Sequence, residues 1–284
     1  SLILSYNSKK NQDDLHVIGS DQFADEHIHY QPGVHTGMGK YATKSLYDTK
    51  KVVLTYDDGP HPKNTPALLD ILKEKDVKAT FFVMGALAKK YPKIIKRMKA
   101  EGHIVAMHAY SHTDSNKLTK AQFENSIEKS IKSIRSAGWT EDKELYFRFP
   151  YGAYGSKRLD YHHYESFKDL GEKMYGENCL NFAFWDVDTS DWYLKRFKDG
   201  AKRIAETTMA YLEGGNAHDF WYLKKKKKPR KIKNGFGGGV ILLHDIHKTS
   251  VDATKIILEN LDENGYEVVP LNQVKEFEYE DSKI

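Results

Sequence analysis

Short apolar runs alternate with segments of helical periodicity along most of the chain. The runs are a few residues long, and several end at a glycine or a proline, which is typical of buried strands. The strands expected on this basis lie at 52–54, 79–84, 103–107, 145–149, 181–185, 240–243 and 267–269. Between them, apolar residues at helical spacing predict helices at 65–75, 119–138, 197–213 and 250–264, one that ends at Gly102, and one within 156–175.

This alternation predicts parallel strands joined by right-handed crossovers. A seven-stranded barrel and an open doubly wound sheet both have this order of elements. With 284 residues the chain has the length of one α/β domain with a single large core. We expect an N-terminal extension (1–49) packed on the main domain, the domain itself (50–275) with a lysine-rich insertion near 212–237, and a C-terminal tail (276–284).

The composition is that of a globular protein, with 39% hydrophobic and 30% charged residues. No apolar run approaches the roughly 18 residues of a transmembrane helix, so no transmembrane segment is expected. The chain begins at Ser1 without a signal-peptide pattern, which is compatible with a processed, exported form. Cys179 is the only cysteine, so an internal disulfide and a thiolate zinc cluster are excluded, and any metal must be held by His, Asp or Glu.

Positive charge is concentrated in one run, residues 224–231. Lys224 to Lys228, Arg230 and Lys231 contribute seven positive charges, and the formal charge of +4 falls to −3 when these seven are left out. We expect a solvated loop near the functional site. An anionic envelope polymer or an acidic membrane surface is favoured as its partner over nucleic acid, because no nucleic-acid-binding fold accompanies the run.

Two adjacent carboxylates, Asp57 and Asp58, follow the first expected strand and precede Gly59 and Pro60. In α/β folds, residues just past the C-terminal end of a strand project into the functional face. Neighbouring side chains there point in different directions, so one carboxylate can bind a metal while the other takes a proton. By themselves, the same residues also form an ordinary solvated turn.

His108 and His112 follow the third expected strand, four positions apart. On a helical turn this spacing places both imidazoles on one face, where they can reach one ion. Together with one carboxylate they form a ligand set that suits zinc, although cobalt, nickel and manganese also fit. A chain with 13 histidines can contain such a pair by chance.

Three more polar segments lie at or near later strand ends, at 148–151 (RFPY), 188–192 (DTSDW) and 242–244 (LLH). Together with 55–60 (TYDDGP) and 108–112 (HAYSH), they resemble in order the motifs of polysaccharide deacetylases of carbohydrate esterase family 4, the NodB-homology domain. That family carries [T/S]-[F/Y]-D-D-G-P, H-[S/T]-x-x-H, R-x-P-[Y/F], D-x-x-D-W and L-x-H. The resemblance implies a distorted (β/α)7 barrel in a single domain.

The resemblance also implies roles for individual residues. Asp58, His108 and His112 are expected to bind one divalent metal, with Asp57 as the catalytic base. A metal-bound water attacks more readily because the metal lowers its pKa and polarises the acetyl carbonyl. Arg148 is expected to hold Asp57 by a bidentate contact.

The remaining roles concern the leaving group and the substrate. His244 is expected to protonate the departing amine, and Asp191 to pair with His244 and raise its pKa. The backbone N–H of Tyr151 is expected to stabilise the oxyanion together with the metal. Trp192 and Leu242 are expected to form the pocket for the acetyl methyl group, and Pro150 to contribute to substrate binding.

One position departs from the family pattern, since Ala109 stands where Ser or Thr is usual. In the family, the hydroxyl of that Ser or Thr supports the His-bearing turn through a hydrogen bond. Without it, we expect a looser metal site in which both histidine ligands are retained. Asp186 and His247 are compatible with either a pocket-lining or a structural role.

The resemblance thus implies a metal-dependent hydrolase that removes N-acetyl groups from N-acetylglucosamine units of a polysaccharide, foremost peptidoglycan. Deacetylation of chitin or chito-oligosaccharides and O-deacetylation of acetylxylan are alternatives, because the same site chemistry permits them. A carbohydrate-binding protein with a vestigial site is an alternative of another class. The expected location is the periplasm, the cell envelope or the extracellular space.

Overall fold

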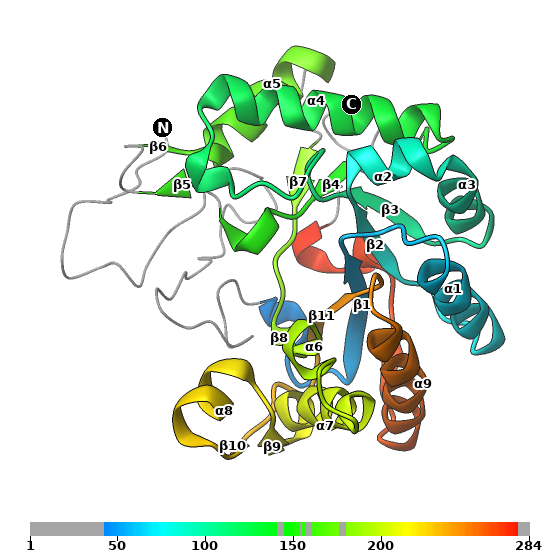
Figure 1. The fold of residues 1–284 in the computed structure, drawn as a ribbon, viewed down its shortest axis with the longest axis vertical. Coiled ribbons are helices and arrows are strands. Elements are labelled where there is room, and N and C mark those ends of the chain that lie inside the picture. The colour runs from blue at the N-terminus through cyan, green and yellow to red at the C-terminus, as the bar shows by residue number, and fades with distance from the viewer. Residues whose placement is uncertain (1–42, 141–144, 154, 157–160, 176–179, 278–284) are drawn as a thin grey trace.

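The computed structural model describes residues 43–140, 145–153, 155–156, 161–175 and 180–277 (Figure 1). Most of the expected N-terminal extension, most of the expected C-terminal tail and Cys179 lie outside these ranges. No helix in the described ranges has the length and apolar character needed to cross a membrane.

Seven parallel strands follow one another in a single curved sheet. Their order is β7 (Leu180–Phe182), β4 (Leu145–Phe147), β3 (Ile104–Met107), β2 (Thr80–Val83), β1 (Lys51–Asp57), β11 (Gly239–His244) and β8 (Val187–Asp188). The two end strands, β7 and β8, are consecutive in the chain, and no pairing joins them in the described residues. The sheet is therefore a distorted (β/α)7 barrel with an open seam, which confirms the expected fold class.

The seventh strand of this barrel differs from the one expected. The last expected strand, β12 (Glu267–Val268), pairs with the start of β1 and lies off the barrel path. Its place is taken by β8, which pairs with β11. The strand β8 has only two residues in a polar segment, so no apolar run marks it in the sequence.

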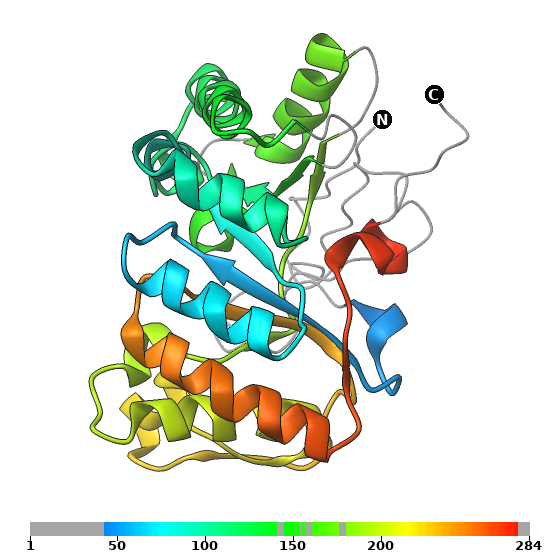
Figure 2. The ribbon, with the colours of Figure 1, turned by 90° about the vertical axis from the view of Figure 1, so that its right-hand side faces the viewer.

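Helices surround the strands on three sides in Figure 1, and Figure 2 shows them along the outer face of the sheet. They are α1 (Asn64–Glu74), α2 (Gly85–Lys90), α3 (Pro92–Ala100), α4 (Lys120–Ser136), α5 (His163–Tyr175), α6 (Asp191–Leu194), α7 (Gly200–Glu213), α8 (Phe220–Lys226) and α9 (Lys248–Glu263). The helix expected to end at Gly102 is α3, and the short α2 before it was not expected. A capping box begins α4, because Thr119 and Gln122 exchange hydrogen bonds of 3.2 and 2.9 Å.

Two small antiparallel sheets and five single 3-10 turns complete the described chain. The sheets are formed by β5 (Gly155–Ser156) with β6 (Tyr161–His162), and by β9 (Gly215–Ala217) with β10 (Arg230–Ile232). The 3-10 turns are Lys44–Leu46, Ser115–Lys117, Pro150–Gly152, Leu271–Gln273 and Lys275–Phe277. The lysine-rich run therefore begins in α8 and ends in β10, and only residues 227–229 lie between these elements, so the expectation of a loop was wrong for most of the run.

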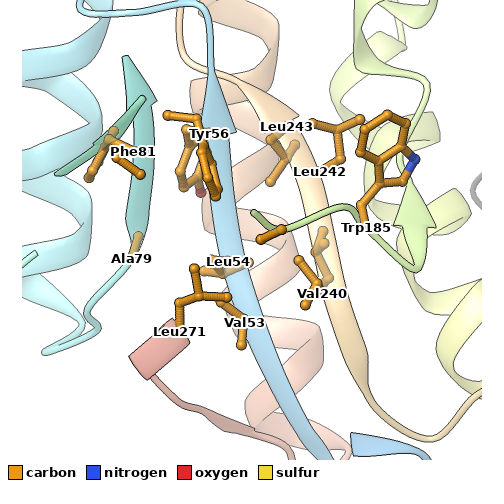
Figure 3. Packing of buried hydrophobic residues seen from close by; sticks show 14 of the residues in the cluster. Val53, Leu54, Tyr56, Ala79, Phe81, Trp185, Val240, Leu242, Leu243 and Leu271 are labelled. Atoms are coloured by element: carbon orange, nitrogen blue, oxygen red, sulfur yellow. The ribbon is translucent and has the colours of Figure 1, made fainter. Parts of the chain in front are cut away.

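The hydrophobic core lies on both sides of β1 and β11, which are neighbours in the sheet (Figure 3). Val53 and Leu54 of β1 and Val240 of β11 are completely buried. Tyr56 stacks on Phe81 of β2, with 5.5 Å between ring centroids. Burial of this apolar surface stabilises the strands whose C-terminal ends carry the polar motifs.

Asp186 fastens the segment before β1 to the barrel. Its Oδ1 accepts hydrogen bonds from the backbone N–H of Thr43 (2.7 Å) and the hydroxyl of Tyr47 (3.1 Å), and its Oδ2 accepts one from the N–H of Val240 (2.7 Å). Burial raises the pKa of Asp186 to about 6. These contacts give Asp186 a structural role.

Candidate active site

Asp57 and Asp58 lie at the C-terminal end of β1, where Asp57 pairs in register with His244 of β11. Asp57 is buried in extended backbone, whereas Asp58 has a left-handed backbone with φ 77°. This change of conformation turns the two carboxylates in different directions. The next residue, Gly59, has no space for a side chain, because a Cβ there would lie 2.3 Å from Oδ2 of Asp245.

Three side chains from two strand ends converge on one point. Oδ1 of Asp58 lies 3.3 Å from Nε2 of His108 and 3.2 Å from Nε2 of His112. One ligand atom from each residue lies within 4.8 Å of the other two. Oδ1 of Asp58 is buried and has no hydrogen-bond partner among the described residues. An unpartnered buried carboxylate oxygen facing two imidazole nitrogens is a donor set that fits a divalent metal ion.

The protonation states of these groups also suit metal binding. Nδ1 of His108 lies 2.8 Å from the carbonyl oxygen of Arg148, so it donates a hydrogen bond there and leaves Nε2 free as a ligand. Burial and the neighbouring His108 lower the pKa of His112. Burial opposes ionisation of Asp58, but contact with His108 outweighs it and holds the pKa of Asp58 well below its usual range.

The turn that carries the two histidines is not helical, and that expectation was wrong. Ala109 has a left-handed backbone with φ 64°. The carbonyls of Ala109 and Tyr110 accept hydrogen bonds from the first two N–H groups of α2, Gly85 (2.9 Å) and Ala86 (3.0 Å). The N–H of Tyr110 donates to the hydroxyl of Ser126 on α4 (3.1 Å). The turn is thus held by two helices, although position 109 offers no hydroxyl.

The buried Arg148 holds Asp57 through a hydrogen bond. Its Nη1 donates to Oδ1 of Asp57 (2.8 Å) and to the hydroxyl of Thr55 (2.7 Å). Its Nε and Nη2 donate to the carbonyls of Ala183 (3.1 Å) and Phe184 (2.8 Å). The expected bidentate contact is therefore wrong, because one nitrogen serves Asp57 and the others hold the segment after β7. Oδ2 of Asp57 stays on the side of the histidines.

The environment of Arg148 is otherwise apolar. The guanidinium is completely buried, and it lies 4.1 Å from the ring centroid of Phe82 and 5.6 Å from that of Trp185. A buried cation with four hydrogen bonds has little freedom to move. Asp57 is consequently held in one orientation.

His244 and Asp191 form a second pair, which comes from β11 and the start of α6. Oδ1 of Asp191 lies 2.7 Å from Nδ1 of His244, and its Oδ2 accepts a hydrogen bond from the backbone N–H of His244 (2.7 Å). Ser250 of α9 donates to Oδ2 (2.6 Å), and the N–H of Trp192 donates to Oδ1 (2.8 Å). Burial opposes the charged imidazole, but the Asp191 carboxylate outweighs it and raises the pKa of His244 to about 10.

The expected substrate-binding residues have different surroundings. Tyr151 is 64% exposed in a left-handed turn, and its ring centroid lies 4.5 Å from that of His112. Pro150 is buried in the same turn. Trp192 is half-buried beside Asp191, whereas Leu242 is buried in β11. A pocket shared by Trp192 and Leu242 stays a prediction.

His247 lies beside His244, with 6.2 Å between the ring centroids. Its Nε2 is 3.3 Å from Nζ of the exposed Lys195. Burial lowers the pKa of His247, which keeps it neutral. His247 therefore lines the His244 side of the site.

The sequence did not indicate four side chains that support the site residues, namely Thr55, Ser126, Asp245 and Ser250. Thr55 lies within the first motif, and Asp245 directly follows the last one, so proximity to a motif was an available signal for both. Asp245 is buried under Gly59 and accepts a hydrogen bond from the hydroxyl of Thr65 (2.5 Å). The two serines lie on α4 and α9 and carry no signal in the sequence.

Comparisons with known proteins agree with this geometry. A family model described as "Polysaccharide deacetylase" matches residues 44–165. A peptidoglycan-N-acetylglucosamine deacetylase of Bacillus cereus is 31% identical over 236 residues, which cover 81% of this chain and 70% of the relative. The peptidoglycan-N-acetylglucosamine deacetylase PgdA of Listeria monocytogenes is 29% identical over 229 residues, 79% of this chain but 39% of the relative's length.

Two further similarities extend the comparison. A chitooligosaccharide deacetylase of Bradyrhizobium is 28% identical over 240 residues, which cover 80% of this chain and 91% of the relative. Among solved structures, the peptidoglycan deacetylase PdaC of Bacillus subtilis superposes with a TM-score of 0.58 at 28% identity, covering 82% of this chain and 92% of that one.

Proposed function

Because the chain belongs to the polysaccharide deacetylase family, whose members are hydrolytic enzymes, we propose that it removes N-acetyl groups from N-acetylglucosamine residues of peptidoglycan. One observation carries the proposal. Asp58, His108 and His112 converge on one point, with the second carboxylate of Asp57 held beside them. The names of the Bacillus cereus and Listeria relatives support peptidoglycan as the polymer.

Asp58, His108 and His112 would hold one divalent ion. Two imidazoles and one carboxylate favour zinc, and cobalt, nickel or manganese have compatible preferences. When bound, such an ion lowers the pKa of a water molecule and polarises the acetyl carbonyl. The hydrogen bond from Nδ1 of His108 to the Arg148 carbonyl orients this ligand in advance.

Asp57 takes the proton from the attacking water. Arg148 binds Oδ1 of Asp57 at 2.8 Å, while Oδ2 lies 3.7 Å from Nε2 of His108 and faces the ligand set. The free oxygen is thus aimed at the place where the water is activated. A positioned carboxylate base accelerates such a step by about a hundredfold to ten-thousandfold.

His244 gives a proton to the departing nitrogen. The water oxygen forms a bond to the acetyl carbon, the C–N bond breaks, and acetate and a free amine are released. Nδ1 of His244 is bonded to Asp191, so the proton on Nε2 is the one transferred. With a pKa of about 10, His244 carries this proton at neutral pH. The N–H of Tyr151, next to His112, donates to the oxyanion.

The alternatives use the same site. The Bradyrhizobium relative favours chitin or chito-oligosaccharides as a second candidate substrate. O-deacetylation of acetylxylan differs in its leaving group, because an alkoxide needs less help from an acid than an amide nitrogen does. His244→Ala should therefore impair release from N-acetyl substrates more than from activated esters. Equal losses on both would contradict the role of His244 as the acid.

One experiment separates these functions. The purified protein is incubated with peptidoglycan, chitin oligomers and acetylxylan in parallel, with and without a chelator, and acetate is measured. The proposal predicts the greatest release from peptidoglycan and its loss on chelation. Binding of these polymers without release of acetate would identify a carbohydrate-binding protein with a vestigial site.

The proposed substrate implies a location outside the cytoplasm, in the periplasm, the cell envelope or the extracellular space. The relatives act on peptidoglycan by name, and this polymer surrounds the cell. Fractionation of cells followed by immunodetection tests this location. Recovery of the protein in the cytoplasmic fraction alone would contradict it.

A further inference from the structure

The helix α8 begins in contact with the acid side of the candidate site. Phe220, its first residue, lies 4.9 Å from Trp192 and 4.8 Å from Tyr193 by ring centroids. Trp192 directly follows Asp191, the residue that holds His244. Figure 1 shows α8 next to the short α6 that carries these two aromatic rings. The lysine-rich part of the chain is therefore connected to the site through a small aromatic cluster.

The five lysines 224–228, called here the lysine cluster, present a concentrated positive surface. All five are exposed, and none of them forms an ion pair with Asp or Glu in the part of the chain that the structure describes. Asp219, the acidic residue nearest in sequence, is buried at the N-terminus of α8, where it accepts hydrogen bonds from Tyr211 and the N–H of Tyr222. The charge of the cluster is thus not neutralised by a neighbouring carboxylate.

Two cations also flank the aromatic cluster itself. Nζ of Lys224 lies 5.4 Å from the ring centroid of Phe220, and Cζ of Arg196 lies 4.1 Å from that of Tyr193. Positive charge therefore begins at the rings that adjoin Asp191 and continues along α8. With a rise of 1.5 Å per residue, Lys226 lies about 9 Å beyond Phe220 along the helix axis.

A solvated helix end accounts for part of this arrangement, because cations near a helix C-terminus interact favourably with its dipole. That effect acts only at the end of the helix, so it does not account for Arg196, which follows α6 on another segment. Five consecutive like charges repel one another, and an anionic partner removes that repulsion.

From these contacts we infer that the lysine cluster binds the carboxylates of a peptidoglycan strand whose N-acetyl group lies at Asp57 and His244. The substrate class is thereby an anionic glycan that carries peptide side chains, and neutral chitin lacks the groups that the cluster recognises. The inference rests on the proposed function, since the polymer must reach both places at once. Nucleic acid has the matching charge but offers no acetyl group to the adjoining site.

A triple variant tests this inference. Lys225→Gln, Lys226→Gln and Lys228→Gln together remove three charges and leave the Lys224 contact with Phe220 intact. The matched control replaces Lys51, Lys73 and Lys75 by Gln, three exposed lysines at the start of β1 and the end of α1, opposite the site. KM and kcat are measured at low and high salt on soluble, peptide-bearing peptidoglycan fragments and on N-acetylglucosamine oligomers.

At low salt we expect KM for the peptide-bearing fragments to rise on the order of tenfold in the triple variant, with kcat unchanged. High salt should raise KM of the unaltered protein towards the value of the variant, because salt screens the same contact. The control variant, and every variant acting on the neutral oligomers, should keep the KM of the unaltered protein. An equal KM of variant and unaltered protein for the peptide-bearing fragments would overturn the inference.

Binding measurements separate a failure of this inference from a failure of the proposed function. If the unaltered protein releases no acetate from any glycan, the proposed function fails, and fluorescence anisotropy of labelled peptide-bearing fragments then tests the lysine cluster alone. Weaker binding by the triple variant supports the inference. Unchanged fragment binding, together with a loss of affinity for a short DNA duplex, would assign the cluster to nucleic acid and overturn it.

Discussion

Asp191 holds His244 through both of its carboxylate oxygens. Oδ1 lies 2.7 Å from Nδ1 of the imidazole, and Oδ2 accepts a hydrogen bond of 2.7 Å from the backbone N–H of the same residue. The hydroxyl of Ser250 and the N–H of Trp192 donate further hydrogen bonds to the same carboxylate of Asp191. The carboxylate therefore cannot rotate away, and the imidazole is fixed with Nε2 available for proton transfer.

Replacing Asp191 by Asn should remove the charge that keeps His244 protonated. An acid catalyst must carry its proton, so activity of the unaltered enzyme falls as the pH rises through the pKa of His244, about 10. In Asp191→Asn, the largest effect that offsets burial is lost, so this pKa falls and the alkaline limb should move to lower pH. We expect kcat at neutral pH to fall by about a hundredfold or more.

The measurement is the pH profile of kcat/KM on an N-acetyl substrate. Ser250→Ala is the matched control, because it removes one contact of Asp191 but leaves its charge. Its alkaline limb should move much less than that of Asp191→Asn. An alkaline limb at the same pH in Asp191→Asn and in the unaltered enzyme would contradict the assigned pairing.

Arg148→Lys should destabilise the fold as well as the site. A lysine cannot serve Asp57, Thr55 and two carbonyls at once, so buried acceptors at Ala183 and Phe184 lose their donors. We expect the free energy of unfolding to fall by about 2 to 4 kcal/mol, measured by denaturant titration. The exposed Arg196→Lys should change it by less than about 0.5 kcal/mol. Similar values for both variants would refute this role of Arg148.

Ser126→Ala should weaken the metal site although Ser126 is not a ligand. It leaves the N–H of Tyr110 without its hydrogen bond of 3.1 Å and so loosens the turn between His108 and His112. We expect zinc affinity to fall about tenfold, as for other groups that orient ligands. Isothermal titration with zinc measures the change, and Ser136→Ala at the exposed end of α4 is the control. Equal affinities would show that Ser126 does not support the turn.

Much of the fold and of the candidate site was predictable because the signals are local. Apolar runs such as Val52 to Leu54 and the capping box at Thr119 depend on neighbouring residues only, and the structure contains the corresponding β1 and α4. The candidate ligands Asp58, His108 and His112 stand at strand ends, and parallel strands bring their ends together at one edge of the barrel.

The features of the fold and of the site that were not predicted depend on contacts between residues far apart in the sequence, which no local pattern indicates. The strand β8 forms because β11 offers it hydrogen bonds, not because its two residues favour a strand. The left-handed backbone of Ala109 is held by Gly85, Ala86 and Ser126, which come from two other elements. Likewise, the distribution of Arg148 nitrogens among four acceptors follows from where the segment after β7 lies.

Asp245→Asn should alter how stability depends on pH. Burial, together with the negative charges of Asp57 and Asp58, raises the pKa of Asp245 from 3.8 to about 7. The folded state therefore binds a proton that the unfolded state has lost between these values, so this residue stabilises the fold below about pH 4 and its contribution disappears as the pH rises through 7. An Asn cannot ionise and should remove this part of the pH dependence.

The free energy of unfolding, measured from pH 4 to pH 8, tests this prediction. Relative to the unaltered protein, Asp245→Asn should gain on the order of a few kcal/mol towards pH 8. Asp252→Asn, on the exposed face of α9, is the control and should follow the curve of the unaltered protein. Parallel curves for Asp245→Asn and the unaltered protein would show that Asp245 ionises normally in the fold.

Asp57→Asn tests most directly the claim that Asp57 is the catalytic base beside a metal site. The substitution removes the base and keeps the expected ligands Asp58, His108 and His112. Acetate released from peptidoglycan is measured with zinc present, and zinc binding is measured on the same samples. We predict that release falls by about a hundredfold to ten-thousandfold while zinc binding persists. Release at the rate of the unaltered protein would contradict it.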